Sequence, residues 1–325
     1  MIQEIAIQNY LPHLGTENVL EEIMTGLNSP QKYIPPKFFY DEKGSELFEE
    51  ITKLDDYYPT RTEKQIISNL FNLIQLNLPH LNIVELGSGD PSKITLLLEQ
   101  IPEDLLSTIN YYPVDICEAE IIKSVNELSR YFSLHTIAGI VADFHHQLHV
   151  IPKKGCRLFC FFGSTLGNFT FDEAENFIRK LAAEMRPGDR LLLGVDMVKD
   201  IPVIERAYND SEGITAQFNL NILNAVNNLI GSDFRPEDFE HMAFFNPNEN
   251  RIEMHLRACK DVDIHIGNNN YKDRIRIRKD ETIHTEYSHK FTYDKIRQLC
   301  QWGDFEQYTV CHDQKGWFSM IYALK

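Results

Sequence analysis

Continuous apolar stretches alternate with amphipathic stretches through the middle of this chain. Short apolar runs, typical of strands buried on both faces, lie at residues 83–86, 111–115, 136–141, 157–162 and 190–195. Apolar side chains at helical spacing lie between them, at residues 92–100, 118–131 and 172–185. Strands that alternate with helices in this way predict an α/β fold with a mostly parallel sheet.

The pattern changes after residue 199 and returns near residue 291. Helical spacing covers residues 201–208 and 214–230, and strand patterns follow at residues 239–247, 250–260, 273–279 and 282–288. A helix at 291–302 and strands at 305–311 and 317–324 then resume the α/β pattern. We therefore predict that residues 60–200 and 286–325 form one domain, and that residues 1–59 and 201–285 form a second, α+β domain that caps it.

The N-terminal part of the chain predicts helices separated by an aromatic segment. Residues 1–30 have helical spacing, and residues 33–40 should be extended because two prolines interrupt them. A turn at 41–45 should precede a helix at 46–52. Thr60 and Glu63 match a capping box for a helix that continues to Leu76.

A glycine turn after the first central strand is the candidate ligand site. Gly87, Ser88 and Gly89 lie between a predicted strand and a predicted helix, where glycines admit a ligand to the backbone and the helix N-terminus offers N–H groups. An ordinary tight turn has the same sequence, so the turn does not decide by itself. Asp115 ends the next strand, where a carboxylate can bind ribose hydroxyls or cap the following helix.

Later strands end in residues that suit an adenine nucleoside. Asp143 offers a carboxylate for an exocyclic amine, and Phe144 offers a ring for stacking. Gly163 begins a loop of small residues at the carboxyl edge of the sheet, where α/β proteins bind ligands. A dinucleotide site prefers a third glycine, where this chain has Ser92. The pattern therefore favours S-adenosylmethionine over NAD, and a class I methyltransferase over a dehydrogenase.

Composition limits the classes of partner. The chain has 325 residues, 43% hydrophobic and 25% charged, which is typical of a globular protein. A net charge of −16 argues against nucleic-acid binding. The sequence has neither a long apolar run nor a signal-peptide pattern, and its six cysteines are scattered. We therefore expect a cytoplasmic monomer without a membrane segment or a metal site.

Several motifs, spread over nearly the whole chain, are similar to those of one enzyme family. These motifs closely resemble those of the histidine-specific methyltransferases of ergothioneine biosynthesis. They lie at residues 39–52, 57–63, 85–89, 163–168, 207–210, 252–254 and 285–288. The resemblance implies a class I methyltransferase (Rossmann-like) sheet with a second, substrate-capping domain. It also implies S-adenosylmethionine-dependent trimethylation of the α-amino group of L-histidine to hercynine.

The resemblance assigns roles to individual residues. Tyr208 and Asn168 match positions that hold the substrate carboxylate and amine, and Glu286 with Ser288 matches positions that bind the imidazole. Tyr57 matches a tyrosine on the substrate side. Asn168 and Tyr208 are therefore expected to be catalytic as well as substrate-binding.

Other expected site residues surround the methyl acceptor and the cofactor. Tyr40, which we also count as catalytic, and Phe48 should face the growing ammonium group, where aromatic rings stabilise a cation, and Met254 should contribute to substrate choice. The expected cofactor-binding residues are Gly87, Ser88, Gly89, Lys93, Asp115, Asp143, Phe144 and Gly163.

Two alternative functions stay open. Relatives act on tryptophan derivatives, so the chain could methylate another free amino acid, and the imidazole-side residues carry the choice of histidine. A non-catalytic protein that binds the cofactor as a partner or sensor is the second alternative, against which Asn168, Tyr208 and Glu286 argue. Asp90 and Pro91 depart from the family pattern after Gly89 and should narrow that loop.

Overall fold

Two separate sheets organise the chain. The structure, a computed structural model, describes residues 4–11, 16–76, 79–266 and 273–325. The chain divides into a first unit, made of residues 1–11, 59–198 and 290–325, and a second unit, made of residues 12–58 and 199–289. Each unit contains one of the two main sheets.

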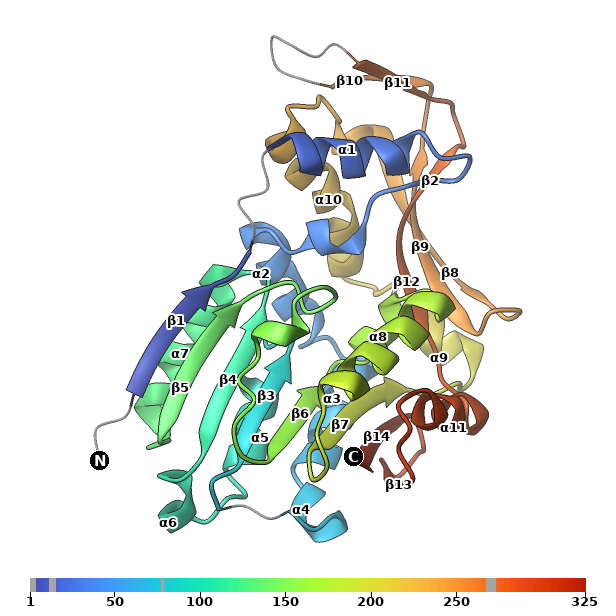
Figure 1. The fold of residues 1–325 in the computed structure, drawn as a ribbon. Coiled ribbons are helices and arrows are strands. Elements are labelled where there is room, and N and C mark those ends of the chain that lie inside the picture. Colours follow the sequence, from blue (N-terminus) through green and yellow to red (C-terminus); the bar gives the residue numbers. More distant parts are fainter. Residues whose placement is uncertain (1–3, 12–15, 77–78, 267–272) are drawn as a thin grey trace. The chain divides into compact units, whose positions relative to one another are not determined.

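The first unit is built on an eight-stranded sheet with the strand order β1-β5-β4-β3-β6-β7-β14-β13 (Figure 1). Neighbours from β1 to β7 are parallel, whereas β14 runs antiparallel to both β7 and β13. The strands are β1 (Glu4–Asn9), β3 (Asn82–Leu86), β4 (Asn110–Asp115), β5 (Thr136–Val141), β6 (Arg157–Phe161), β7 (Arg190–Asp196), β13 (Gln307–His312) and β14 (Phe318–Leu324).

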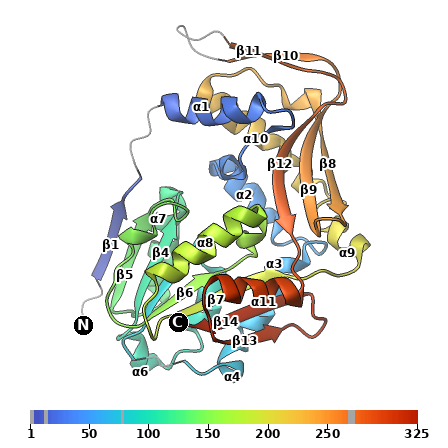
Figure 2. The ribbon, with the colours of Figure 1, turned by 45° about the vertical axis from the view of Figure 1, so that its right-hand side comes forward.

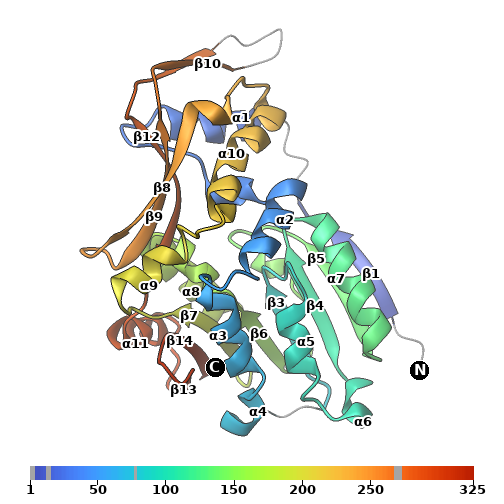
Figure 3. The same cartoon turned by 180° about the vertical axis from the view of Figure 1, so that it is seen from behind.

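Helices cover both faces of this sheet. Helices α3, α5 and α7 lie on one face, and α8 and α11 lie on the other (Figures 1 and 3). The helices of the unit are α3 (Tyr58–Ile67), α4 (Leu70–Leu73), α5 (Ser92–Leu98), α6 (Glu103–Leu106), α7 (Glu118–Tyr131), α8 (Phe171–Glu184) and α11 (Tyr293–Trp302), with short 3-10 helices at Leu148–Val150 and Thr165–Asn168.

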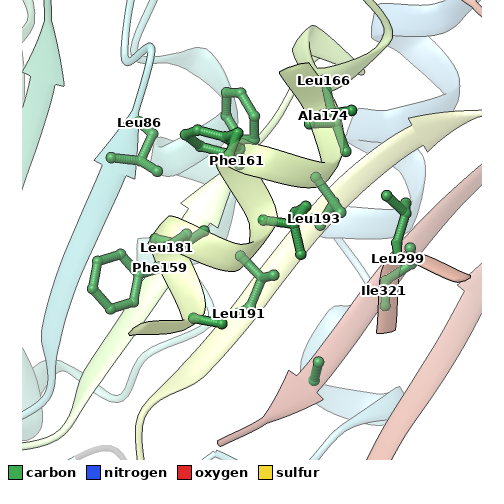
Figure 4. Packing of buried hydrophobic residues seen from close by; sticks show 14 of the residues in the cluster. Leu86, Phe159, Phe161, Leu166, Ala174, Leu181, Leu191, Leu193, Leu299 and Ile321 are labelled. Atoms are coloured by element: carbon green, nitrogen blue, oxygen red, sulfur yellow. The ribbon is translucent and has the colours of Figure 1, made fainter. Parts of the chain in front are cut away.

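The apolar core of the first unit lies on both sides of the sheet because successive strand residues point to opposite faces. Ile83 belongs to the cluster under α3, α5 and α7, whereas Val84 belongs to the cluster under α8 and α11. Phe159 and Phe161 of β6 pack with Leu181 of α8 in the second of these clusters (Figure 4). Burial of both faces explains why the central strands are continuous apolar runs.

The second unit is built on a four-stranded sheet in the order β2-β12-β9-β8, of which β12, β9 and β8 are labelled in Figure 2 and β2 in Figure 1. Helix α10 packs against α2 and against β8 and β9. The elements of the unit are α1 (Thr16–Leu27), β2 (Lys32–Tyr33), α2 (Glu42–Ile51), α9 (Ile201–Arg206), α10 (Ile214–Ile230), β8 (Phe239–Asn246), β9 (Arg251–Ala258), β10 (Val262–Ile266), β11 (Asp273–Ile277) and β12 (Thr282–His289), with 3-10 helices at Pro36–Phe39 and Pro236–Asp238.

The structure corrects the predicted domain limits at two places. Residues 4–9 were expected to be helical and to lie in the second domain, but they form β1, which pairs in parallel with β5 of the first sheet. Ile5 and Ile7 are two positions apart, as residues on one face of a strand are, and the edge of β5 supplies the backbone partners. Residues 286–289 belong to the second unit instead of the first, because β12 pairs with β9 as far as His289.

Local predictions near the N-terminus also need correction. Residues 36–39 form a 3-10 helix within the segment expected to be extended, and α2 begins at Glu42, where Asp41 accepts a hydrogen bond from the Gly44 N–H at 2.7 Å. Helix α3 begins at Tyr58 and ends at Ile67, so Thr60 and Glu63 lie inside it and form no capping box. Pro59 fits the first turn because the N–H that proline lacks has no partner within the helix there.

Membrane crossing can be assessed for the helices that the structure describes. Within residues 4–11, 16–76, 79–266 and 273–325, no helix has both the length and the apolar character that spanning a bilayer requires.

Candidate functional site

The glycine loop after β3 is tied to the end of β4 by one carboxylate. Gly87 and Gly89 have φ angles of 67° and 37°, a region that favours glycine. The Gly89 N–H donates to Asp115 Oδ2 at 3.1 Å, and the Cys117 N–H donates to Asp115 Oδ1 at 3.0 Å. Burial raises the pKa of Asp115 even though these backbone hydrogen bonds lower it. Asp115 therefore both holds the loop and starts the turn into α7.

The predicted adenine residues lie beside this loop. A Cβ at Gly87 would lie 3.7 Å from Cε1 of Phe144, which is an ordinary contact distance, so the glycine loop lies against that ring. Asp143 accepts a hydrogen bond from the His145 N–H at 2.9 Å, and His146 Nδ1 lies 2.9 Å from its other oxygen. Burial acts to raise the pKa of Asp143, but the bonds from His146 and His145 outweigh it and lower that pKa.

Lys93, which is partly exposed, forms an ion pair with a buried carboxylate, and the sequence prediction missed this pair. Lys93 Nζ lies 2.9 Å from Glu63 Oε2, and both Glu63 oxygens accept from the Gly163 N–H at 2.9 Å. A side chain at Gly163 would approach Lys93 Nζ to 3.1 Å. Glu63 is fully buried, which excludes the surface capping role expected for it. The sequence signal available for this role was the position of Glu63, four residues after Pro59 and on the inner face of the helix.

A second buried carboxylate lies below the glycine loop. Glu85 of β3 is buried, and the Tyr111 hydroxyl of β4 donates to its Oε2 at 2.5 Å. Burial raises the pKa of Glu85 to about 8, although the Tyr111 hydrogen bond acts in the opposite direction. This rise in pKa favours the protonated form of the Glu85 carboxyl near neutral pH.

Asn168 lies in the first unit, at the end of the 3-10 helix that follows β6. Ser164 precedes that helix with a φ of 55°, and its hydroxyl accepts from the Asp196 N–H at 2.9 Å. This bond attaches the loop of small residues to the end of β7. Asn168 is therefore presented at the carboxyl edge of the sheet, where ligands bind in α/β proteins.

The predicted aromatic residues meet in the second unit. The rings of Tyr40 and Phe48 are 5.8 Å apart, those of Phe48 and Tyr57 are 6.4 Å apart, and those of Tyr57 and Tyr208 are 6.3 Å apart, all edge to face. Phe218 of α10, which the sequence prediction missed, lies 5.9 Å from Phe48 and 6.1 Å from Tyr40. A continuous path of rings thus runs from Tyr40 to Tyr208.

The predicted polar substrate residues meet on one face of the second sheet. The Tyr208 hydroxyl donates to Ser288 Oγ at 2.7 Å. Glu286 pairs with Met254, and Ser288 pairs with Ile252, across the β12–β9 ladder. Opposed residues share a face, so Glu286, Ser288 and Met254 lie together on the face that Tyr208 contacts. All of them are at least nine-tenths buried.

The residues of the first unit suit an S-adenosylmethionine site. The expected residues follow β3, β4, β5 and β6 at their carboxyl ends. Gly87 lies against the Phe144 ring, and Gly163 lies against Lys93 Nζ. The buried Ser88 hydroxyl has no hydrogen-bond partner among the residues that the structure describes. An aromatic face, a carboxylate, a cation and an unused hydroxyl match the adenine, ribose and amino-acid parts of this cofactor.

Comparison with known proteins shows which family this chain resembles. The family described as "Histidine-specific methyltransferase, SAM-dependent" matches residues 19–325. The histidine N-alpha-methyltransferase of Mycobacterium tuberculosis is 39% identical over 259 residues, which cover 78% of this chain and 80% of that protein. The enzyme of the same description from Mycolicibacterium smegmatis is 37% identical over 323 residues, which cover 99% of each chain.

More distant matches concern another substrate and the fold. The 4-dimethylallyltryptophan N-methyltransferase of Claviceps purpurea is 26% identical over 336 residues, which cover 95% of both chains. The structure of mitomycin 7-O-methyltransferase has a TM-score of 0.50 at 11% identity, covers 89% of this chain and 59% of that one, and supports the fold alone. The expected α/β, Rossmann-like methyltransferase fold is confirmed, and the chain belongs to the family of S-adenosylmethionine-dependent, histidine-specific methyltransferases.

Proposed function

We propose that this chain transfers three methyl groups from S-adenosylmethionine to the α-amino group of L-histidine and so produces hercynine, the step that the family resemblance assigns to ergothioneine biosynthesis. The observation that carries the proposal is the Tyr208–Ser288 hydrogen bond on a sheet face that also holds Glu286 and Met254. This face combines polar groups for an imidazole with a tyrosine that reaches the rest of an amino acid.

The first unit would hold the cofactor, which supplies an electrophilic methyl group on a sulfonium. Asp115 would bind the ribose, Asp143 and Phe144 the adenine, and Lys93 the carboxylate of the methionine part. The expected loop residues Gly87, Ser88, Gly89 and Gly163 would let the backbone approach it. The arrangement of Asp115 and Lys93 around two glycine-containing loops supports these roles.

The second unit would hold the imidazole. Glu286 can accept a hydrogen bond from one ring N–H, and Ser288 on the same face can bind the other ring nitrogen. Met254 lies between strand neighbours on this face and would limit the width of the ring that fits. Tyr57, which contacts Tyr208 through its ring, would line the same side of the substrate.

Methyl transfer is an in-line displacement, so the residues around the amine must position a neutral nitrogen. Asn168 and Tyr208 would bind the substrate amine and carboxylate, since an amide and a phenol make hydrogen bonds without fixing a full charge. Tyr40 and Phe48 would face the nitrogen as it becomes a quaternary ammonium, which aromatic rings stabilise. The edge-to-face packing of these two rings keeps them next to each other.

A tryptophan derivative is the second candidate substrate, because a tryptophan-directed N-methyltransferase matches nearly the full length of this chain. The polar pair Glu286 and Ser288 disfavours it. An indole has a single N–H and a wider ring, so it would leave part of this buried pair unsatisfied.

The test is turnover of a panel of free amino acids with S-adenosylmethionine, followed by mass spectrometry. We expect histidine to gain one, two and then three methyl groups, while tryptophan and its derivatives react far more slowly. Faster methylation of tryptophan would overturn the substrate assignment, and the absence of any methylated product would overturn catalysis itself.

The remaining expectations form part of the same proposal. We propose that the second unit caps the first during the reaction, so that Asn168 and Tyr208 act on one substrate. A monomeric state and a cytoplasmic location, expected from the composition and the scattered cysteines, complete it.

A further inference from the structure

We propose that a buried chain of Thr285, Asn219 and His241 positions the imidazole-binding pair by holding a β-bulge in β12, and thereby sets the preference for histidine. The inference deepens the proposed function and rests on it. None of these three residues was expected at the site, and each acts here through other residues.

The bulge lies directly before Glu286. His284 of β12 pairs with His255 of β9, and Glu286 pairs with Met254. His284 and Glu286 are two positions apart on β12, whereas their partners His255 and Met254 are adjacent on β9. Thr285 is therefore the extra residue on β12. Such an insertion changes the direction of the side chains that follow it, and it is frequent beside functional sites.

The extra residue decides which face receives the substrate groups. Without it, strand alternation would put Glu286 and Ser288 on the same face as His284. With it, the face of His284 is continued by Tyr287, whose ring lies 3.8 Å from the His284 ring. Glu286 and Ser288 are thereby turned to the opposite face, where Ser288 accepts from Tyr208.

Side chains from α10 and β12 hold the bulge in place. The Thr285 hydroxyl lies 2.7 Å from Asn219 Oδ1 and 3.1 Å from the Met254 carbonyl oxygen, two acceptors for its single hydrogen. Asn219 Nδ2 donates to the His255 carbonyl oxygen at 2.9 Å. Two β9 carbonyls at the bulge are thus bound by side chains, and Thr285 and Asn219 are completely buried.

His241 extends this chain to Tyr208. Its Nε2 lies 2.9 Å from the Tyr208 carbonyl oxygen, which only accepts, so Nε2 carries the hydrogen. Its Nδ1 then accepts from Asn219 Nδ2, 2.9 Å away, because both amide hydrogens are donors. The Tyr208 hydroxyl in turn donates to Ser288, so the hydrogen bonds connect β12, α10, β8 and the turn after α9 in a closed circuit.

This circuit joins the two groups that must act on one small molecule. Tyr208 is expected to bind the amino-acid end, and Glu286 with Ser288 is expected to bind the ring. A fixed distance and direction between them would select a ring by the positions of its nitrogens, because sites built on buried hydrogen bonds reject analogues that leave them unpaired. The circuit therefore predicts a role in substrate preference more than in cofactor binding.

The experiment is a graded series at Thr285: Thr285→Ser keeps the hydroxyl, Thr285→Cys has a weaker donor, and Thr285→Val has none. Cofactor affinity and thermal midpoint report whether each variant is folded. We expect the ratio of kcat/KM for histidine to that for tryptophan to fall by at least about tenfold in Thr285→Val, chiefly through KM, and less in Thr285→Cys. Thr285→Ser should restore most of the ratio.

A double-mutant cycle separates positioning from general stability. In a Glu286→Ala background, Thr285→Val should change the histidine-to-tryptophan ratio by less than about twofold, because the residue it positions is gone. An unchanged ratio in both the Thr285→Val and the Thr285→Cys single variants, or an equal loss in the two backgrounds, would overturn the inference. Failure of wild type to methylate histidine would instead overturn the proposed function. If Thr285→Val is not obtained folded, Thr285→Cys carries the same comparison.

Discussion

The two larger sheets of this protein carry their candidate functional residues in different places. In the first unit the candidate cofactor residues follow the ends of strands, on loops such as Gly87–Gly89 and the segment after Gly163, while the central strands β3 and β6 are buried on both faces. In the second unit the candidate substrate residues lie within strands, on the face of β12 and β9 that Tyr208 contacts. The first sheet therefore positions loops that carry the candidate cofactor residues, whereas the second sheet carries the candidate substrate residues on its own strands.

This difference decides how each site responds to change. A loop site depends on backbone groups and on a few anchors, such as Asp115, that hold the loops together. A site on a sheet face depends on strand phase, because a shift of one residue turns every side chain to the opposite face. Substitutions in the loop site should therefore weaken cofactor binding gradually. A change of strand phase in the sheet-face site should instead abolish substrate specificity in one step.

The largest expected effect comes from removing the carboxylate on the sheet face. Glu286→Ala should lower kcat/KM for histidine by about 100-fold, since a hydrogen bond to a charged group contributes roughly 1.5–3 kcal/mol. Cofactor affinity, measured by calorimetry, should not change. Competition between histidine and tryptophan gives the specificity, and adding Met254→Val should move it further toward tryptophan. A histidine-to-tryptophan ratio equal to that of wild type would mean that Glu286 does not bind the ring.

The matching change in the first unit is Asp115→Ala. It should weaken S-adenosylmethionine binding by roughly 1.5–3 kcal/mol, the usual contribution of hydrogen bonds to a charged group. Histidine affinity, measured with saturating cofactor, should change much less. Asp115→Asn is the matched control, because it keeps one acceptor for the Gly89 N–H. Unchanged cofactor affinity in Asp115→Ala would mean that Asp115 has only a structural role, as the acceptor in the turn before α7.

A smaller effect should follow from the hydrogen bond between Tyr208 and Ser288. Ser288→Ala removes the acceptor of the Tyr208 hydroxyl, and an ordinary net hydrogen bond contributes about 1 kcal/mol. We expect KM for histidine to rise about fivefold with little change in kcat. Tyr208→Phe and the double variant complete a cycle, in which a coupling energy near zero would show that the two residues act independently.

A last effect concerns the pH dependence of stability instead of substrate or cofactor binding, and it has opposite signs in the two sheets. The pKa of Glu85 is raised by burial to about 8, so the folded chain keeps a proton that the unfolded chain releases above about pH 4.5. The stability contributed by this group is therefore complete below that pH and is lost as pH rises toward 8. The amide side chain of the Glu85→Gln variant cannot titrate. As the pH is raised from about 4.5 to 8, the thermal midpoint of this variant should therefore increase by a few degrees relative to that of wild type.

His284 in the second sheet provides the contrast. Burial, followed by the nearby His255, lowers the pKa of His284 to about 3, so the folded chain resists a proton that the unfolded chain binds below about pH 6.5. The contribution of His284 is complete above that pH and is lost as pH falls toward 3. The thermal midpoint of His284→Phe should therefore rise relative to that of wild type only at acidic pH. If Glu85→Gln and His284→Phe changed the thermal midpoint with the same dependence on pH, the opposite pKa shifts of Glu85 and His284 would be contradicted.

The first unit was predictable because its physical signals are local. Strands buried on both faces must be apolar throughout, glycines are needed where φ is positive, and Asp115 ends a strand that was visible as an apolar run. Where prediction failed in this unit, a partner distant in sequence decided the outcome. The edge of β5 made residues 4–9 a strand, and the Gly163 N–H drew Glu63 into the interior.

In the second unit the sequence by itself determined the residue types, through the family resemblance, and the positions of most strands. Tertiary structure decided how those residues face. The spacing of Glu286 and Ser288 gives them a common face, but it does not say which face, because that depends on an extra residue at Thr285. The partners that hold Thr285 come from α10 and β9, at Asn219 and Met254. A bulge maintained by such contacts leaves no periodic signal in its own strand, and this is why only the folded chain revealed it.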